Sequence, residues 1–184
     1  VVFALASTGK KDIEDAYLIA KEDAFSTNDA YLLGLVANAA YDLGKQEDGD
    51  QLMQAFYAQS DRLGLGNLAV NRGVAYGRGN AVQVETSALG VLANLKARVV
   101  KQGYLDQSVS YILANKKFGG YGNTQATVLA LKALVAYSSY TSNTSRTGSL
   151  AVHINGKSGE PMTYSLSNTD RIEIDQLETQ LTSG

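Results

Sequence analysis

The chain has 184 residues, of which 45% are apolar, and its formal net charge at pH 7 is −2. This is enough to bury the core of one domain, and the mixed charges give no reason to expect nucleic acid or an anionic membrane as a partner. Cysteine is absent and His153 is the only histidine, which excludes a disulfide framework, a cysteine nucleophile and a multi-histidine metal site within these residues.

Two kinds of predicted helix alternate along the first 140 residues. Residues 28–43, 84–95 and 124–137 are apolar on nearly every face, which is typical of buried helices. The stretches LGLVANAA, from Leu33, and LGVLANLK, from Leu89, nearly repeat each other. A repeat at a spacing of tens of residues indicates an array of helical hairpins.

The intervening segments have one polar face each. Residues 12–22, 48–63 and 104–115 carry apolar side chains at helical spacing with charges elsewhere. An inner ring of buried helices wrapped by an outer ring explains this alternation better than a flat bundle does. The predicted fold class is therefore mainly α, a partial α/α toroid of helical hairpins. No run of about 18 residues is free of polar interruptions, so no membrane span is expected.

The predicted ends of these helices follow from turn and capping chemistry. Thr27 or Asn28 is expected to cap the first inner helix, and Gly44 follows its end. Residues 65–82 are rich in glycine and poor in helix formers, which predicts a long irregular connection.

The composition changes after the last helix. Residues 138–149 are small and polar, which is typical of a linker. Beyond them SLAVHING ends in Asn155-Gly156, a hairpin signal, and MTYSL and RIEID are further strand candidates. We therefore predict toroid hairpins over 1–140, a linker over 141–149 and a short incomplete β-sandwich over 150–184. Because both ends look cut, we expect the chain to be part of a larger protein.

The stretch FGGYGNTQAT contains the first candidate site. A phosphate-binding loop needs a lysine and a hydroxyl directly after its last glycine, and GGYGNTQ supplies neither. The alternative, which we favour, is a tight turn in which Gly120 or Gly122 has positive φ and Asn123 or Thr124 caps the next helix.

Glu85 is the second candidate, because it lies near the predicted start of an inner helix. It could act as a general base, or it could complement the helix dipole and bond to backbone amides, which we favour. Asp29 is the one carboxylate that could pair with it as a glycosidase requires. His153 is expected to be a solvated residue on a strand, and the tyrosines are expected to pack with their polar tips at the rim.

Two stretches together resemble a known family. VQVETSALGVLANLK, from Val82, and FGGYGNTQATVLALKALVAY, from Phe118, resemble the end of the thioester-containing domain of the alpha-2-macroglobulin and complement family. The matching positions are Val84, Glu85 and Ser87 in the first stretch and Gly119, Gly120, Tyr121, Gly122, Thr124, Gln125 and Thr127 in the second. The resemblance implies that these residues shape the start of the last inner helices and bind no cofactor.

The resemblance also implies a context for the chain. In the family the toroid is inserted into a CUB-type β-sandwich, to which residues 149–181 look like the return. The family's reactive thioester joins a cysteine and a glutamine in a Gly-Cys-Gly-Glu-Gln sequence near the start of the toroid, and this chain has no cysteine. The implied function is a non-catalytic scaffold within a secreted, periplasmic or surface-attached protease trap or complement-like defence protein. Its partners would be the other domains of that protein and, through the intact protein, proteases.

Two other functions remain open from the residues alone. One is an enzyme built on the same toroid, such as a terpenoid cyclase, a prenyltransferase or a glycosidase, with its catalytic half elsewhere. The other is a helical-repeat interaction module. An incomplete toroid would expose one side of an inner helix, so we also expect the isolated chain to self-associate.

Overall fold

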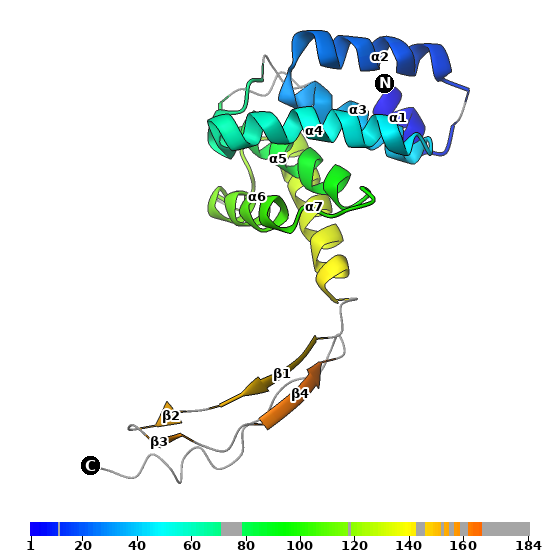
Figure 1. The fold of residues 1–184 in the computed structure, drawn as a ribbon. Coiled ribbons are helices and arrows are strands. Elements are labelled where there is room, and N and C mark those ends of the chain that lie inside the picture. The colour runs from blue at the N-terminus through cyan, green and yellow to red at the C-terminus, as the bar shows by residue number, and fades with distance from the viewer. Residues whose placement is uncertain are drawn as a thin grey trace. The chain divides into compact units, whose positions relative to one another are not determined.

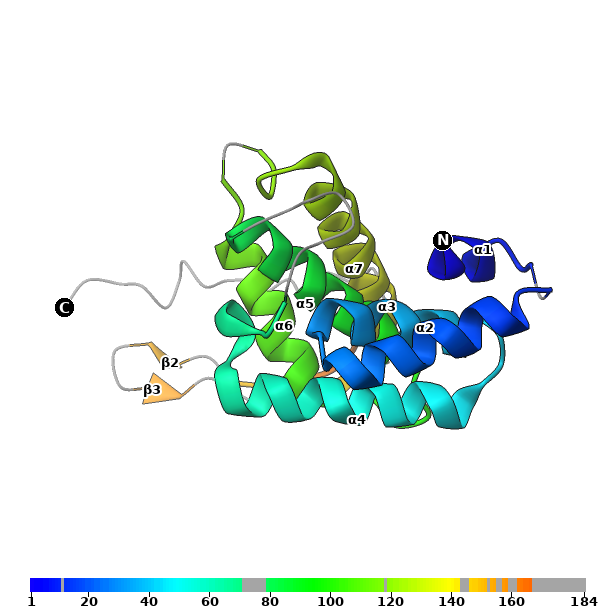
Figure 2. The same ribbon diagram turned by 90° about the horizontal axis from the view of Figure 1, so that it is seen from above.

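The computed structural model describes residues 1–10, 12–70, 79–117, 119–142, 146–151, 153–154, 157–158 and 162–166. The chain divides into two compact units, Val1–Tyr137 and Ser138–Gly184. The first is a helical array and the second contains the described strands (Figures 1 and 2). No described helix is long and apolar enough to cross a membrane.

The helices follow the predicted order. They are α1 (Val2–Ser7), α2 (Glu14–Thr27), α3 (Ala30–Asp42), α4 (Gln46–Leu63), the short 3-10 helix η1 (Leu65–Asn67), α5 (Asn80–Asn94), α6 (Gln102–Ala114) and α7 (Thr124–Ser142). The six long helices match the six predicted segments, with ends that differ by a few residues. The predicted irregular connection 65–82 is shorter than expected, because η1 opens it and α5 already begins at Asn80; residues 71–78 lie outside the described part.

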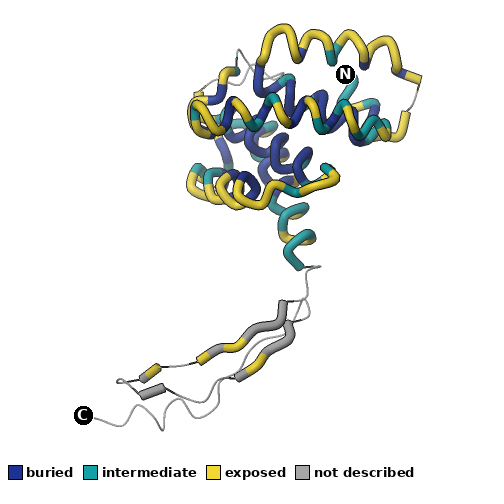
Figure 3. The backbone as a smooth tube through the Cα atoms, in the orientation of Figure 1, coloured by how far each residue is buried: buried dark blue, intermediate teal, exposed yellow. Residues whose placement is uncertain are grey.

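Inner and outer helices differ in burial as the sequence predicts (Figure 3). No residue of α3 is exposed, and after its first residue α5 is also covered on every side, whereas α2, α4 and α6 each keep an exposed face. Packing of α3 against α1, α2, α4 and α5 accounts for its burial. The chain thus forms a mainly helical, toroid-like array.

Helix α7 departs from this pattern. It buries Ala126, Ala130 and Ala133, but Leu131 is 53% and Val135 is 65% exposed. The prediction that this helix is covered on every side is therefore wrong, because the described elements pack against only part of its circumference.

Close helix contacts in the inner layer depend on small residues and one buried amide. The side of Gly34 that lacks a side chain faces Leu89 of α5, whose Cβ would lie 3.1 Å from a Cβ placed there. Asn38 Nδ2 donates hydrogen bonds to the carbonyl oxygens of Gly34, at 2.8 Å, and Leu89, at 2.9 Å. These contacts hold the middle of α3 against the middle of α5.

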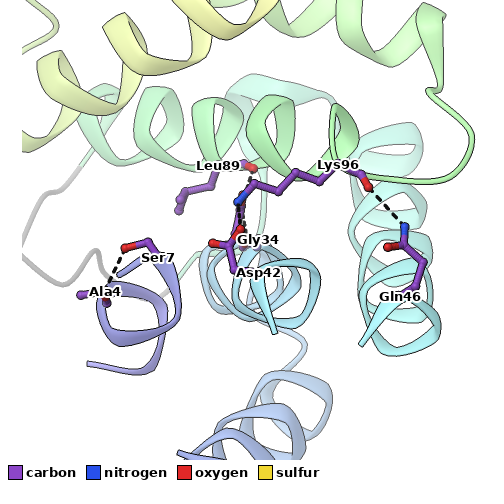
Figure 4. Close-up of polar contacts among 8 residues, drawn as sticks. Ala4, Ser7, Gly34, Asp42, Gln46, Leu89 and Lys96 are labelled. Carbon is purple, nitrogen blue, oxygen red and sulfur yellow. Dashed lines mark hydrogen bonds and ion pairs between the residues drawn. The ribbon is translucent and has the colours of Figure 1, made fainter. Parts of the chain in front are cut away.

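Polar contacts join the region just after α5 to the C-terminal end of α3 and to the first residue of α4 (Figure 4). Lys96 Nζ lies 2.7 Å from Asp42 Oδ1, and Gln46 Nε2 donates to the carbonyl oxygen of Lys96 at 3.2 Å. The cation follows the end of α5, where it also complements the helix dipole.

The predicted cap of α3 needs a correction. Asp29, rather than Thr27 or Asn28, is the capping residue, and its Oδ1 accepts hydrogen bonds from the backbone of Tyr31, at 2.8 Å, and Leu32, at 3.2 Å. Helix α2 continues to Thr27, and Asn28 ends it in the left-handed conformation with φ 49°. Asparagine tolerates that conformation better than most residues, which leaves the carboxylate of Asp29 to cap the following helix.

The second unit contains short antiparallel pairs. Strand β1 (Arg146–Leu150) pairs with β4 (Met162–Leu166), and β2 (His153–Ile154) pairs with β3 (Lys157–Ser158). The β2–β3 pairing agrees with a hairpin across Asn155-Gly156, although these two residues and the predicted strand RIEID lie outside the described part. The linker predicted over 141–149 is contracted, because α7 runs to Ser142 and β1 begins at Arg146.

A polar clamp holds α2 against α4. Asp48 accepts hydrogen bonds from Tyr17 Oη, at 2.7 Å, and Lys21 Nζ, at 2.6 Å. Burial would raise the pKa of Asp48, but these two bonds outweigh it and hold the pKa below its ordinary value. Burial, reinforced by the bond to Asp48, raises the pKa of Tyr17.

Asp48→Asn is expected to destabilise the helical unit by about 1 kcal/mol at neutral pH. Because the folded pKa of Asp48 lies below the unfolded one, its contribution is complete above the unfolded pKa and is lost as the pH falls through the folded value. Urea unfolding of both proteins from pH 7 to pH 2.5 should therefore show free energies of unfolding that converge in acid. A difference that is independent of pH would contradict this account of the clamp.

Candidate functional site

The N-terminal ends of α3, α5 and α7 are linked by side-chain hydrogen bonds. Asn123 Nδ2 donates to Glu85 Oε1 at 2.9 Å, which links α7 to α5. Gln125 Nε2 donates to Tyr31 Oη at 2.8 Å, which links α7 to α3 across 94 positions of sequence. We call Tyr31, Glu85, Asn123 and Gln125 the inner-helix cluster.

The glycine-rich turn positions Asn123 in this cluster. Gly119 and Gly122 have φ values of +83° and +100°, and the backbones of Lys117 and Gly120 exchange two hydrogen bonds. Asn123 Oδ1 then accepts a hydrogen bond from the backbone of Ala126 at 2.7 Å, so Asn123 caps α7. Of the predicted alternatives, positive φ is confirmed at Gly122 and the cap is Asn123. Phe118 lies outside the described part.

The hydroxyl of Thr127 completes the turn. It accepts a hydrogen bond from the backbone N–H of Tyr121, at 3.1 Å, and donates to the carbonyl oxygen of Asn123, at 2.9 Å. The side chain of Thr127, in the first turn of α7, thus provides hydrogen-bond partners for two backbone groups of the glycine-rich turn. This geometry supports the favoured interpretation of the glycines as a tight turn and helix cap.

Gly122→Val should destabilise the helical unit by roughly 1–3 kcal/mol. A β-branched residue is strained at φ +100°, and a Cβ at this position would lie 3.1 Å from Cβ of Ala81 in α5. Thermal unfolding of Gly120→Ala provides the comparison and should show a smaller loss, because Gly120 does not have positive φ and its added Cβ, 3.2 Å from Thr127 Oγ1, meets only the end of a side chain. Equal losses from the two replacements would show that the turn is not strained at Gly122.

Glu85 has a different structural role from the one predicted. Helix α5 begins at Asn80, so Glu85 lies in its second turn, beyond the free amides of the helix start. The residue is 0% exposed, and its described partner is the side-chain amide of Asn123. Its other oxygen, Oε2, has no hydrogen-bond partner among the described residues.

The proposed pairing of Glu85 with Asp29 gains no support. Asp29 is occupied in capping α3, and Glu85 is occupied by Asn123. Two cavities lie beside the cluster, against the glycine-rich turn and the start of α7, and neither Glu85 nor Asp29 lines them. His153 is exposed on β2, as the sequence predicts.

The remaining residues of the family resemblance surround the cluster. Val84 and Ser87 are 0% exposed on α5, and Tyr121 is 4% exposed in the turn. Thr124 is exposed at the first position of α7. The structure therefore brings the two motifs together, through Glu85 and Asn123. Sequence reasoning missed Tyr31 as the partner of Gln125, since no local pattern distinguishes it from the other helical tyrosines.

A groove of about 900 Å³ adjoins the cluster. Its walls are mostly apolar side chains of α1, α3 and α7, and Tyr31, Asn123, Thr124 and Gln125 contribute its polar groups. No lysine, arginine, aspartate, glutamate or histidine side chain lines it. Such a lining suits packing against apolar atoms and offers no acid–base pair. No group of three or more His, Cys, Asp or Glu residues suited to a metal occurs in the described part of the chain.

Comparison with known proteins identifies the family. A sequence model of the A-macroglobulin TED domain matches residues 25–137, which is more than half of the chain and includes the whole inner-helix cluster. Neither the curated proteins nor the solved structures gave a match. With both motifs joined in one helical array, the chain belongs to the A-macroglobulin TED domain family.

Proposed function

We propose that this chain is a non-catalytic scaffold within a macroglobulin-like protease trap or complement-like defence protein, and that it carries no thioester of its own. The observation that supports this most is the inner-helix cluster. Glu85, Asn123 and Gln125 of the two motifs, together with Tyr31, join α3, α5 and α7, and among the described residues this cluster does not pair a nucleophile with a general base.

The chemistry of the chain agrees with this role. A thioester is reactive because a thiolate is a good leaving group, and the sequence contains no cysteine to supply one. The carboxamide of Gln125 is a poor acyl donor, and its nitrogen already donates to Tyr31. The one histidine, His153, lies on β2 rather than in the helical unit.

Membership of the family supports a proposed setting for this scaffold. The intact protein would act outside the cytoplasm, as a secreted, periplasmic or surface-attached molecule. The β segment would continue into a CUB-like sandwich, and the helical unit would contact other domains of the same protein. Proteases would meet the intact protein rather than this unit alone.

The test is covalent reactivity. The full chain is incubated separately with methylamine, with glycerol and with trypsin whose active site has been blocked beforehand, and intact mass is measured after each. We expect no adduct, because no activated carbonyl is present. A mass increase of one methylamine or glycerol, or a bond between the chain and trypsin, would overturn the proposal; Gln125→Ala would then show whether Gln125 is the acyl donor. The same incubation in urea controls for reactions of exposed side chains.

A further inference from the structure

The side chain of Asn123 serves two helices at once. Its Oδ1 accepts a hydrogen bond from the backbone N–H of Ala126, at 2.7 Å, and thereby caps α7. Its Nδ2 donates to Oε1 of Glu85 in α5, at 2.9 Å. One amide group therefore caps one inner helix and supplies a hydrogen bond to a buried carboxylate of another.

The backbone of Asn123 is held independently of these two bonds. Thr127 Oγ1 donates to the carbonyl oxygen of Asn123 at 2.9 Å and accepts from the backbone N–H of Tyr121 at 3.1 Å. With the main chain held in this way, the side-chain amide has two orientations of nearly the same shape, which differ by the exchange of its oxygen and its nitrogen. The neighbours of the amide must select one of them.

Both neighbours select the same orientation. The backbone N–H of Ala126 can only donate, so it requires the amide oxygen. The carboxylate oxygen of Glu85 accepts, so it requires the amide nitrogen. In the reversed orientation two donors would face each other at the start of α7, and two acceptors would face each other at Glu85, which leaves buried polar groups unpaired.

Burial gives the contact with Glu85 particular weight. Glu85 is 0% exposed, and its Oε2 has no partner among the described residues, so Asn123 is the donor on which the carboxylate depends. A buried carboxylate that loses its hydrogen bond is costly, because water does not replace the lost donor. The contact with Glu85 therefore carries a large share of the preference between the two amide orientations.

We infer that Glu85 is a positioning residue that couples α5 to the start of α7 through the orientation of the Asn123 amide. The effect of a change at residue 123 on the cap of α7 then depends on the side chain at residue 85. Helix α7 is also the helix in which the helical unit ends, at Tyr137. This coupling belongs to the helical unit and holds whether or not the intact protein is a protease trap.

Asn123→Asp, made both in the unmodified chain and together with Glu85→Gln, tests the coupling. Aspartate can still cap α7, but it removes the donor to Glu85 and places a second carboxylate against it. With Glu85→Gln present, the glutamine Nε2 can donate to the aspartate, so donor and acceptor are exchanged and the cap is kept. Hydrogen exchange of the Ala126 N–H, read by NMR on the full chain, should rise at least about fivefold for Asn123→Asp alone. It should not rise when Asn123→Asp is added to Glu85→Gln.

An equal rise in both backgrounds, or no rise in either, would overturn the coupling. If far-UV circular dichroism shows that Asn123→Asp alone does not fold, the double variant should still fold, and failure of both to fold would also overturn it.

Asn67→Asp is the matched control. Asn67 is exposed in η1, and its Nδ2 donates to the carbonyl oxygen of Leu63 at 3.3 Å, so its replacement adds the same charge at a position without a bond to Glu85. This variant should change the exchange of the Ala126 N–H by the same factor in the two backgrounds. A difference as large as that for Asn123→Asp would show that net charge, rather than the contact between Asn123 and Glu85, is responsible.

Discussion

Gly90→Ala is expected to destabilise the helical unit by about 3 kcal/mol, at the upper end of what overpacking usually costs. Gly90 is buried in α5, and a Cβ there would lie 2.0 Å from Tyr104 Oη and 2.8 Å from Cζ of Phe56. Both rings are themselves buried, so neither can move away without disturbing α4 or α6. Alanine would otherwise be favoured over glycine within a helix, which makes the sign of this prediction informative.

Urea unfolding with two further variants separates this clash from a general effect of the substitution. Gly103→Ala in α6 meets no atom within 4 Å and should be neutral or slightly stabilising. Tyr104→Phe combined with Gly90→Ala should recover part of the loss, since it removes the nearest atom. If Gly90→Ala unfolds at the same urea concentration as the unmodified chain, the packing described for α5 against α4 and α6 is wrong.

Phe56→Ala should cost roughly 3–5 kcal/mol, as is usual for removing a fully buried aromatic ring. Phe56 is 0% exposed, and its ring meets Tyr104 edge to face with centroids 5.8 Å apart. It also lies against Gly34 and Gly90, so its loss opens a cavity where α3, α4 and α5 meet.

Phe25→Ala provides the comparison for that value. Phe25 is 39% exposed on α2, so its replacement should cost well under half as much. Calorimetry of the three proteins gives both differences. Similar melting temperatures for Phe56→Ala and Phe25→Ala would show that Phe56 is not at the centre of the core.

Much of the helical unit could be predicted from the sequence because its helices differ so clearly in apolarity. All-round apolarity identified α3 and α5 as buried, and the helix ends were located to within a few residues. The start of α5 was missed because Asn80 to Gln83 lack a strong capping signal. The N-cap residue of α5 is Gly79, which has no side chain to form a capping hydrogen bond. The cap of α3 was misplaced because three neighbouring polar residues could all have served.

The candidate site was predictable in its parts but not in its connections. The glycine turn and the cap at Asn123 follow from local chemistry, which a sequence shows directly. The bonds from Asn123 to Glu85 and from Gln125 to Tyr31 join residues 38 and 94 positions apart, and no local pattern specifies such partners. The exposure of Leu131 and Val135 on α7 also depends on which helices surround α7, rather than on the composition of α7.

The bond between Gln125 and Tyr31 has a consequence for the order of folding. It closes a loop that contains α4, α5 and α6, so the loop-closure entropy that it costs is smaller once those helices have packed. A contact that forms after the folding nucleus contributes mainly to the unfolding rate. We therefore expect the last inner helix to be secured after the rest of the array, so that its attachment affects mainly how long the folded unit persists.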